Sequence, residues 1–203
     1  MKLLHIDSSV LADNSVSRLL TARIAAEWQA LNPGAEVEYL DLAIDTPAHL
    51  SGEILGARFT PAEAHSALQK AETERTEAYL AQFLSADVIV VGAPMYNFSI
   101  PSQLKAWIDR VAQAGRTFKY TETGPVGLAG GKTVIVASSR GGVYSASEAL
   151  RALDHQEAYL KTVFGFFGIT DVRFVRAEGV NLGEQKKAEA LAAAEKDIAV
   201  VTA

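Results

Sequence analysis

The sequence predicts an α/β protein built on a doubly wound, five-stranded parallel sheet with helices on both faces. Two observations predict this class. First, five apolar runs alternate with five helical patterns along the 203 residues. Second, the runs D-V-I-V-V-G-A at 87–93 and T-V-I-V-A-S at 133–138 are almost continuously apolar, as strands covered on both faces must be.

The strand candidates differ in how strictly apolar and polar residues alternate along them. They are residues 2–7, 36–42, 87–93, 133–138 and 172–176. The second sets Glu36 and Glu38 between apolar residues, and the fifth sets Arg173 between Val172 and Phe174. Alternation is typical of a strand with one wetter face, so these two strands are expected at the sheet edges. This fits the order 2-1-3-4-5 of flavodoxin-like folds, although the edge argument alone also allows other inner orders.

Capping residues and apolar stripes predict the helices between these strands. An apolar stripe predicts the first helix over 16–31, and the capping box Thr60-Pro61-Ala62-Glu63 predicts a second toward Leu84. A third helix is expected to begin at Pro101 and to stop at Gly115. A fourth is expected to begin at 154–157 and to end near Gly168, and the last to begin at 181–184. Residues 43–59 are expected to form a structureless loop, and 116–127 a hairpin or lid near the ligand-binding end of the sheet.

Composition and charge exclude several classes of protein. Hydrophobic residues make up 49%, charged residues 21%, and the net charge is −5 with scattered Lys and Arg, which argues against a nucleic-acid partner. The absence of cysteine excludes disulfides, thiolate metal sites and cysteine nucleophiles. The four histidines are scattered, so no metal site is expected. No signal-peptide pattern or membrane span is visible, and we expect a single cytoplasmic domain over 1–203.

The loop after the first strand favours a phosphate. Residues 8–18 hold four serines and Asn14 around the start of the first helix. Hydroxyls and free N–H groups at a helix N-terminus bind phosphate well, whereas simple N-capping would explain only one such residue. No lysine lies in the loop, so the phosphate is expected to be held mostly by hydrogen bonds.

The loops after the third and fourth strands favour a flat ring. The first of them, 93–101, places Met, Tyr and Phe beside Asn97, although a loop packed against the core or a second subunit would look similar. The other, 138–145, contains Gly141 and Gly142, which permit close backbone approach but also suit a plain turn. All three loops follow inner strands, so we expect them at one sheet edge. Phe118 and Tyr120 of the hairpin either cover the same ring or serve only packing.

Several motifs together resemble one family. They are Ser9 with N-S-x-S at 14–17, P-M-Y-N-F at 94–98, K-A-W-I-D at 105–109, T-F-x-Y-T at 117–121 and S-R-G-G at 139–142. With these motifs the chain resembles the FMN-dependent NAD(P)H azoreductases, a branch of the flavodoxin-like quinone reductases, over essentially its whole length. One departure is Tyr144, where relatives often carry histidine, so no proton-donor role is transferred to it.

The resemblance implies a set of site residues for a non-covalently bound FMN. Ser9, Ser15, Val16 and Ser17 would hold the phosphate; Met95, Tyr96, Asn97 and Phe98 would contact the ring; Ser139, Arg140, Gly141 and Gly142 would contact its pyrimidine end. Phe98, Phe118 and Tyr120 would form the substrate pocket. No side chain is assigned a catalytic role, because the flavin itself carries the hydride.

The resemblance also implies an activity. It is ping-pong transfer of electron pairs from NADH or NADPH to quinones and aromatic azo compounds, in a homodimer with two sites at its interface. Two other hypotheses remain open: a flavodoxin-type electron carrier, and a regulatory subunit that uses a flavin fold to bind a partner.

Overall fold

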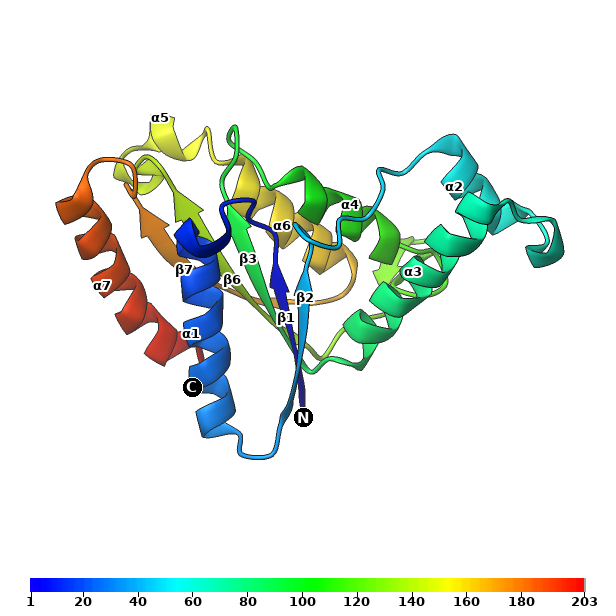
Figure 1. Ribbon diagram of the computed structural model, residues 1–203, viewed down its shortest axis with the longest axis horizontal. Coiled ribbons are helices and arrows are strands. Elements are labelled where there is room, and N and C mark those ends of the chain that lie inside the picture. Colours follow the sequence, from blue (N-terminus) through cyan, green and yellow to red (C-terminus); the bar gives the residue numbers. More distant parts are fainter. Residues whose placement is uncertain (203) are drawn as a thin grey trace.

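A five-stranded parallel sheet forms the centre of the computed structural model, which describes residues 1–202 (Figure 1). In spatial order the strands are β2 (Glu36–Asp41), β1 (Lys2–Asp7), β3 (Val88–Pro94), β6 (Thr133–Arg140) and β7 (Asp171–Glu178). The predicted order 2-1-3-4-5 is confirmed, and the two alternating strands lie at the edges. The continuously apolar β3 is buried along its whole length because it lies between β1 and β6.

Helices cover both faces of the sheet, with α1 and α7 in front and α4 and α6 behind in Figure 1. The longer helices are α1 (Val16–Leu31), α3 (Ala67–Ser85), α4 (Ser102–Val111), α6 (His155–Phe166) and α7 (Glu184–Thr202). Two short helices, α2 (Gly52–Gly56) and α5 (Glu148–Arg151), lie in connections. Among residues 1–202, no helix has both the length and the apolar character needed to cross a bilayer.

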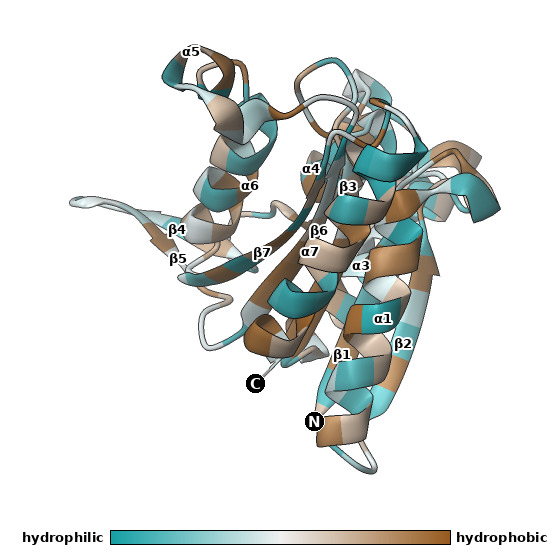
Figure 2. Ribbon diagram, turned by 90° about the vertical axis from the view of Figure 1, so that its left-hand side faces the viewer, coloured by the Kyte–Doolittle hydropathy of each residue, from teal (hydrophilic) through white to brown (hydrophobic). Residues whose placement is uncertain are grey.

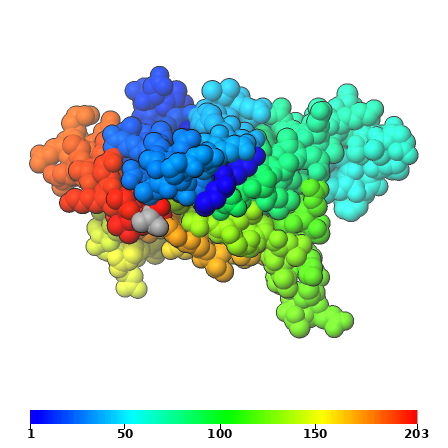
Figure 3. All heavy atoms as spheres, turned by 90° about the horizontal axis from the view of Figure 1, so that it is seen from below, coloured from blue at the N-terminus to red at the C-terminus, as the bar shows by residue number. Residues whose placement is uncertain are grey.

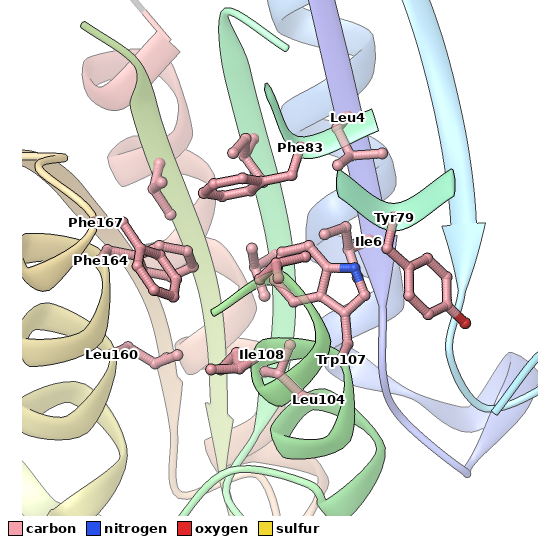
Figure 4. Packing of buried hydrophobic residues seen from close by; sticks show 14 of the residues in the cluster. Leu4, Ile6, Tyr79, Phe83, Leu104, Trp107, Ile108, Leu160, Phe164 and Phe167 are labelled. Atoms are coloured by element: carbon pink, nitrogen blue, oxygen red, sulfur yellow. The ribbon is translucent and has the colours of Figure 1, made fainter. Parts of the chain in front are cut away.

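Each face of the sheet has its own core, because neighbouring side chains of a strand point to opposite sides. Leu3 and Val90 face α1 and α7, whereas Leu4 and Val91 face α3, α4 and α6. The core on the side of α3, α4 and α6 is rich in aromatic rings, shown in Figure 4. There Phe83 packs edge-to-face against Trp107 and Phe167, at centroid distances of 5.8 and 5.7 Å. In Figure 2 the inner strands of the five-stranded sheet are largely hydrophobic, whereas β2, α1 and α7 alternate hydrophobic and hydrophilic residues.

The predicted start of the second long helix is wrong. Helix α3 begins at Ala67 rather than after Thr60. Ser66 provides the capping box: its Oγ accepts from the Gln69 N–H at 3.2 Å, and the Gln69 side chain accepts from the Ser66 N–H at 3.0 Å. The Thr60 hydroxyl instead donates to the Gly56 carbonyl at 3.0 Å. Two capping patterns lie six residues apart in the sequence, and only the second forms the reciprocal pair of bonds.

Other predicted boundaries also change. Helix α4 ends at Val111, four residues before the predicted stop at Gly115. The Thr117 hydroxyl donates a hydrogen bond to the carbonyl of this last helical residue at 2.8 Å. Helix α7 begins at Glu184, and its first hydrogen bond runs from the Lys187 N–H to the Gly183 carbonyl, so Asn181 is not its cap. The region 43–59 is not structureless, because it contains α2 and a 3-10 turn at Ala57–Phe59.

The predicted hairpin is present as β4 (Phe118–Thr121) and β5 (Gly124–Gly127), and it projects from the body of the molecule (Figure 2). Its predicted position near the ligand-binding end of the sheet is wrong, because its base contacts Phe167 and Gly168, just before the amino end of β7. Its base is packed tightly against the end of α6. A Cβ at Gly127 would lie 2.1 Å from the backbone nitrogen of Gly168 and 2.3 Å from the carbonyl carbon of Phe167. The Ala129 N–H donates to the Phe167 carbonyl at 2.8 Å. Position 127 therefore requires glycine for close backbone contact.

We expect Gly127→Ala to lower the free energy of unfolding by about 2 kcal/mol or more, because two backbones must separate to admit the methyl group. Gly165→Ala is the matched control: this exposed helical glycine has no atom within 4 Å of an added Cβ, and we expect a gain of up to ~1 kcal/mol. Urea denaturation followed by circular dichroism measures both. Equal stability of the two variants would contradict the close approach.

Candidate functional site

Three loops meet at the carboxyl ends of β1, β3 and β6. Parallel pairing sets Pro94 opposite Ser139, so the chain leaves both strands at one level. The Met95 N–H donates to the Ser139 carbonyl at 2.8 Å, which ties the second predicted loop to the third. The hydroxyls of Ser9 and Tyr96 lie 3.3 Å apart, which joins the first loop to the second. The structure thus brings together the three loops that the sequence singled out.

The first loop ends in an arrangement suited to an anion. Helix α1 begins at Val16, and the Ser15 Oγ accepts from the Arg18 N–H at 3.3 Å. The Ser15 and Ser17 hydroxyls are 3.1 Å apart. The N–H groups of Val16 and Ser17 belong to the first turn, where no intrahelical acceptor exists. Free N–H groups and hydroxyls therefore gather at the positive end of the helix dipole.

A small cavity of about 100 Å³ lies at this helix end. Ser9, Ser15, Val16 and Ser139, all predicted site residues, line it. Three residues that the sequence did not suggest for the site also line it: Val180 and Asn181, in the turn after β7, and Lys187 of α7. The available signal was that β7 also ends at this edge of the sheet, so the residues after it belong near the same loops.

Arg18 holds the first loop in place, but it does not line this cavity. Its guanidinium donates to the Ser9 carbonyl at 2.8 and 3.2 Å. It also forms a bidentate ion pair with Asp41 at the end of β2, with N···O distances of 2.5 and 2.7 Å. The only cation within 8–18 is therefore engaged with the backbone and with an edge strand.

A second buried carboxylate lies beneath the same loop. Asp7 at the end of β1 accepts from the Thr21 hydroxyl at 2.8 Å and from the Tyr39 hydroxyl at 3.0 Å. Burial raises the pKa of Asp7, but His5 and these two hydroxyl donors outweigh it, so the net pKa lies below the usual value. Burial, followed by the charge of Asp7, raises the pKa of Tyr39 to about 12. These groups keep Asp7 ionised and the loop base rigid.

The second loop contains a tight reversal of the chain. Tyr96 and Ser99 exchange backbone hydrogen bonds at 2.9 and 3.1 Å. The two residues between them, Asn97 and Phe98, have φ of 50° and 70°, as the central positions of a type I′ turn require. Phe98 is 46% exposed, and its ring meets the edge of Tyr144 at a centroid distance of 6.3 Å. The turn thus presents an aromatic side chain at the rim.

The third loop is held from below by a buried arginine. Arg140 is 3% exposed and pairs with Asp154 at 2.8 Å and with Glu157 of α6. Its guanidinium is therefore committed to the protein interior, which leaves only its backbone for a ligand. Glu178 at the end of β7 accepts from the Tyr144 and Ser145 N–H groups at 2.9 and 3.1 Å.

The glycines of this loop lie against neighbouring side chains. A Cβ at Gly141 would lie 2.7 Å from the Asn181 amide nitrogen, and one at Gly142 would lie 3.5 Å from the Tyr144 ring. Of the described residues 138–145, Ser139 alone lines the cavity beside Ser9, whereas Asn181 and Tyr144 lie against the two glycines.

Two predicted residues lie elsewhere. Phe118 is buried and packs against Phe166 at a centroid distance of 4.4 Å, so its ring belongs to the core. Tyr120 is 73% exposed on the projecting hairpin. Neither residue lines the cavity beside Ser9, so within one chain the structure does not bring them to the three loops. Among residues 1–202, no cluster of three His, Asp or Glu side chains suits a metal ion.

Comparison with known proteins agrees with this geometry. A family model described as a flavodoxin-like fold matches residues 1–201. An FMN-dependent NADH:quinone oxidoreductase of Laribacter hongkongensis is 76% identical over 201 residues, covering 99% of this chain and all of the relative. One of the same name from Azospirillum brasilense is 59% identical, covering 98% of this chain and 96% of the relative.

Solved structures give the same result. An FMN-dependent NADH-azoreductase of Bacillus anthracis, in complex with FMN, is 31% identical with a TM-score of 0.90, covering 99% of this chain and 97% of the other. A second azoreductase from that species is 32% identical with a TM-score of 0.88, and the match covers 100% of this chain and 99% of the other. The chain therefore belongs to the flavodoxin-like fold family and, within it, to the group of FMN-dependent NADH:quinone oxidoreductases.

Proposed function

We propose that this protein binds FMN at the three loops and transfers electron pairs from NADH to quinones and aromatic azo compounds. One observation carries the proposal: the loops after β1, β3 and β6 are joined by the Ser9–Tyr96 and Met95–Ser139 contacts in a chain 76% identical to a protein named for this activity. The azo substrates are supported by the azoreductases of the same fold at 31% and 32% identity.

The first loop fits the phosphate of FMN. Ser9 and Ser15 would supply hydroxyls within the cavity, and Val16 an N–H group. Ser17 does not line the cavity, but its hydroxyl lies 3.1 Å from that of Ser15, and its N–H belongs to the same first turn of α1. A cavity of about 100 Å³ suits a phosphate group and not a whole flavin. The ring is then expected to extend from this cavity over the loops that follow β3 and β6.

The other two loops fit the ring. Met95, Tyr96, Asn97 and Phe98 would contact it from the tight turn. Ser139, Gly141 and Gly142 would face its pyrimidine end, where backbone N–H groups favour negative charge. We also assign the Arg140 backbone to this end, because its side chain is held by Asp154 and Glu157.

Bound FMN supplies the redox chemistry, accepting a hydride from NADH and passing two electrons to the acceptor. The residues of this chain bind and orient. The loop held by Glu178 keeps N–H donors in place, and Phe98 and Tyr144 cover part of the rim against water. Reduction of a quinone consumes NADH and a proton and yields NAD⁺ and a quinol. Cleavage of an azo bond to two amines takes four electrons and therefore two NADH.

We further propose that the protein acts as a homodimer in the cytoplasm, as one domain. Two exposed aromatic side chains support an interface with a second copy of this chain. Phe59, in the connection after α2, is 83% exposed, and Tyr120, on the hairpin, is 73% exposed. In Figure 3 both segments extend away from the body of the molecule. Beside the turn at Asn97 and Phe98 lies a cavity of about 550 Å³ that a partner's aromatic side chain could enter. Its lining combines the aromatic rings of Tyr96 and Tyr159 and the side chain of Ile100 with polar residues such as Ser102 and Lys105.

The first test of the function is the purified protein itself. We expect a yellow protein that releases FMN on denaturation and oxidises NADH rapidly in the presence of menadione. An electron carrier of the flavodoxin type, or a regulatory subunit, would bind flavin with negligible turnover. A colourless protein that does not take up added FMN would contradict the proposal.

The second test concerns the phosphate. Ser17→Ala is expected to weaken FMN binding by roughly 10- to 100-fold, because a hydrogen bond to a charged group contributes about 1.5–3 kcal/mol. Ser85→Ala is the matched control, since its hydroxyl bonds only the Gln82 carbonyl of its own helix. Flavin fluorescence titration measures binding, and circular dichroism checks the fold. Unchanged FMN affinity in Ser17→Ala would remove Ser17 from the phosphate site.

The third test concerns the dimer. Sedimentation velocity is expected to show a dimer for the wild type and a shift to monomer for Phe59→Asp and Tyr120→Asp, because burying a carboxylate in an apolar contact is costly. Val200→Asp, on exposed α7, is the control and should remain dimeric. A monomeric wild type, or dimers throughout, would contradict the assigned contact.

A further inference from the structure

We propose that Lys187 supplies the positive charge that pairs with the phosphate of FMN, a role that rests on the proposed cofactor site. Lys187 lies in the first turns of α7, 170 residues beyond the phosphate loop in sequence, yet it lines the same cavity as Ser9, Ser15 and Val16. Two segments far apart in the sequence therefore form the walls of one cavity.

The phosphate loop lacks a cation of its own. A phosphate monoester carries about −1.5 to −2 charges at neutral pH. Within 8–18 the only basic residue is Arg18, whose guanidinium is bound to Asp41 and the Ser9 carbonyl. The helix dipole contributes only about half a charge. Hydroxyls and N–H groups alone would leave much of the phosphate charge uncompensated.

Lys187 has the position and the freedom to compensate it. Its side chain is half-buried at the cavity, and among residues 1–202 it forms no ion pair or side-chain hydrogen bond. The adjacent Lys186 differs, because it is exposed, pairs with Glu189 at 2.8 Å and does not line the cavity. The Lys187 N–H is anchored on the Gly183 carbonyl at 3.0 Å, which fixes where its side chain leaves the helix. A flexible ammonium with three donors suits a phosphate.

A second residue closes the cavity on the same side. Asn181, in the turn before α7, also lines it, and its N–H donates to the Gly141 carbonyl at 3.3 Å. The segment leading into α7 is thus tied to the loop after β6, so Lys187 is held beside the cavity by backbone contacts. The simpler alternative is a lysine that only interacts with solvent.

The comparison of FMN with riboflavin separates these two readings, because riboflavin lacks the phosphate. Apoprotein is titrated with each flavin, and binding is followed by quenching of flavin fluorescence. For Lys187→Met we expect FMN affinity to fall about three- to tenfold while riboflavin affinity stays unchanged. Lys187→Arg should retain most of the FMN affinity. Lys186→Met is the matched control and should bind both flavins as the wild type does.

Ionic strength gives a second readout. Added NaCl should reduce the FMN-to-riboflavin affinity ratio of the wild type more than that of Lys187→Met, because salt screens the lysine–phosphate attraction. Unchanged FMN affinity in Lys187→Met, or equal losses for FMN and riboflavin, would overturn the assignment of Lys187. A wild-type apoprotein that binds neither flavin would instead overturn the proposed function.

Discussion

The parallel pairing of β1, β3 and β6 places three separate loops at one edge of the sheet, and the site depends on it. Asp7 is opposite Gly92, and Pro94 is opposite Ser139. The pairing continues beyond the strands in the Met95–Ser139 backbone bond. A shift of register by one residue would turn every side chain of a strand to the other face and separate these loops. The two hydrophobic cores, which accept only one set of faces, therefore also determine the geometry at the loops.

Two arginines, the partly buried Arg18 and the buried Arg140, hold the loops in place through ion pairs. Arg18 joins the first loop to β2 through Asp41, and Arg140 joins the third loop to α6 through Asp154 and Glu157. Buried ion pairs of this kind contribute little net stability, because desolvation offsets most of the attraction, but they fix the position of the groups that they join. A rigid rim lowers the conformational entropy that a ligand must otherwise remove on binding.

Most of the fold follows from the sequence, because its strands and amphipathic helices have strong local patterns. The edge positions of β2 and β7 were predictable from the sequence, because Glu36, Glu38 and Arg173 interrupt their apolar runs and a strand covered on both faces does not tolerate such charges. The start of α3 was not, because Thr60 and Ser66 both begin acceptable capping patterns and only tertiary contacts decide between them. The serine loop, the turn and the glycine loop were found from composition alone. Asn181 and Lys187 were missed, since a single amide or lysine near a helix start has no local signature.

The left-handed backbone at Asn97 and Phe98 has a consequence for how the protein can evolve or be redesigned. Asparagine adopts this conformation easily, whereas a bulky residue does so at a cost, and a β-branched residue such as valine or isoleucine is nearly excluded. The backbone therefore limits which residues can replace Phe98 without a loss of stability. Tyr144, whose ring lies edge-on to that of Phe98 at a centroid distance of 6.3 Å, has no such constraint and is the more permissive position to vary.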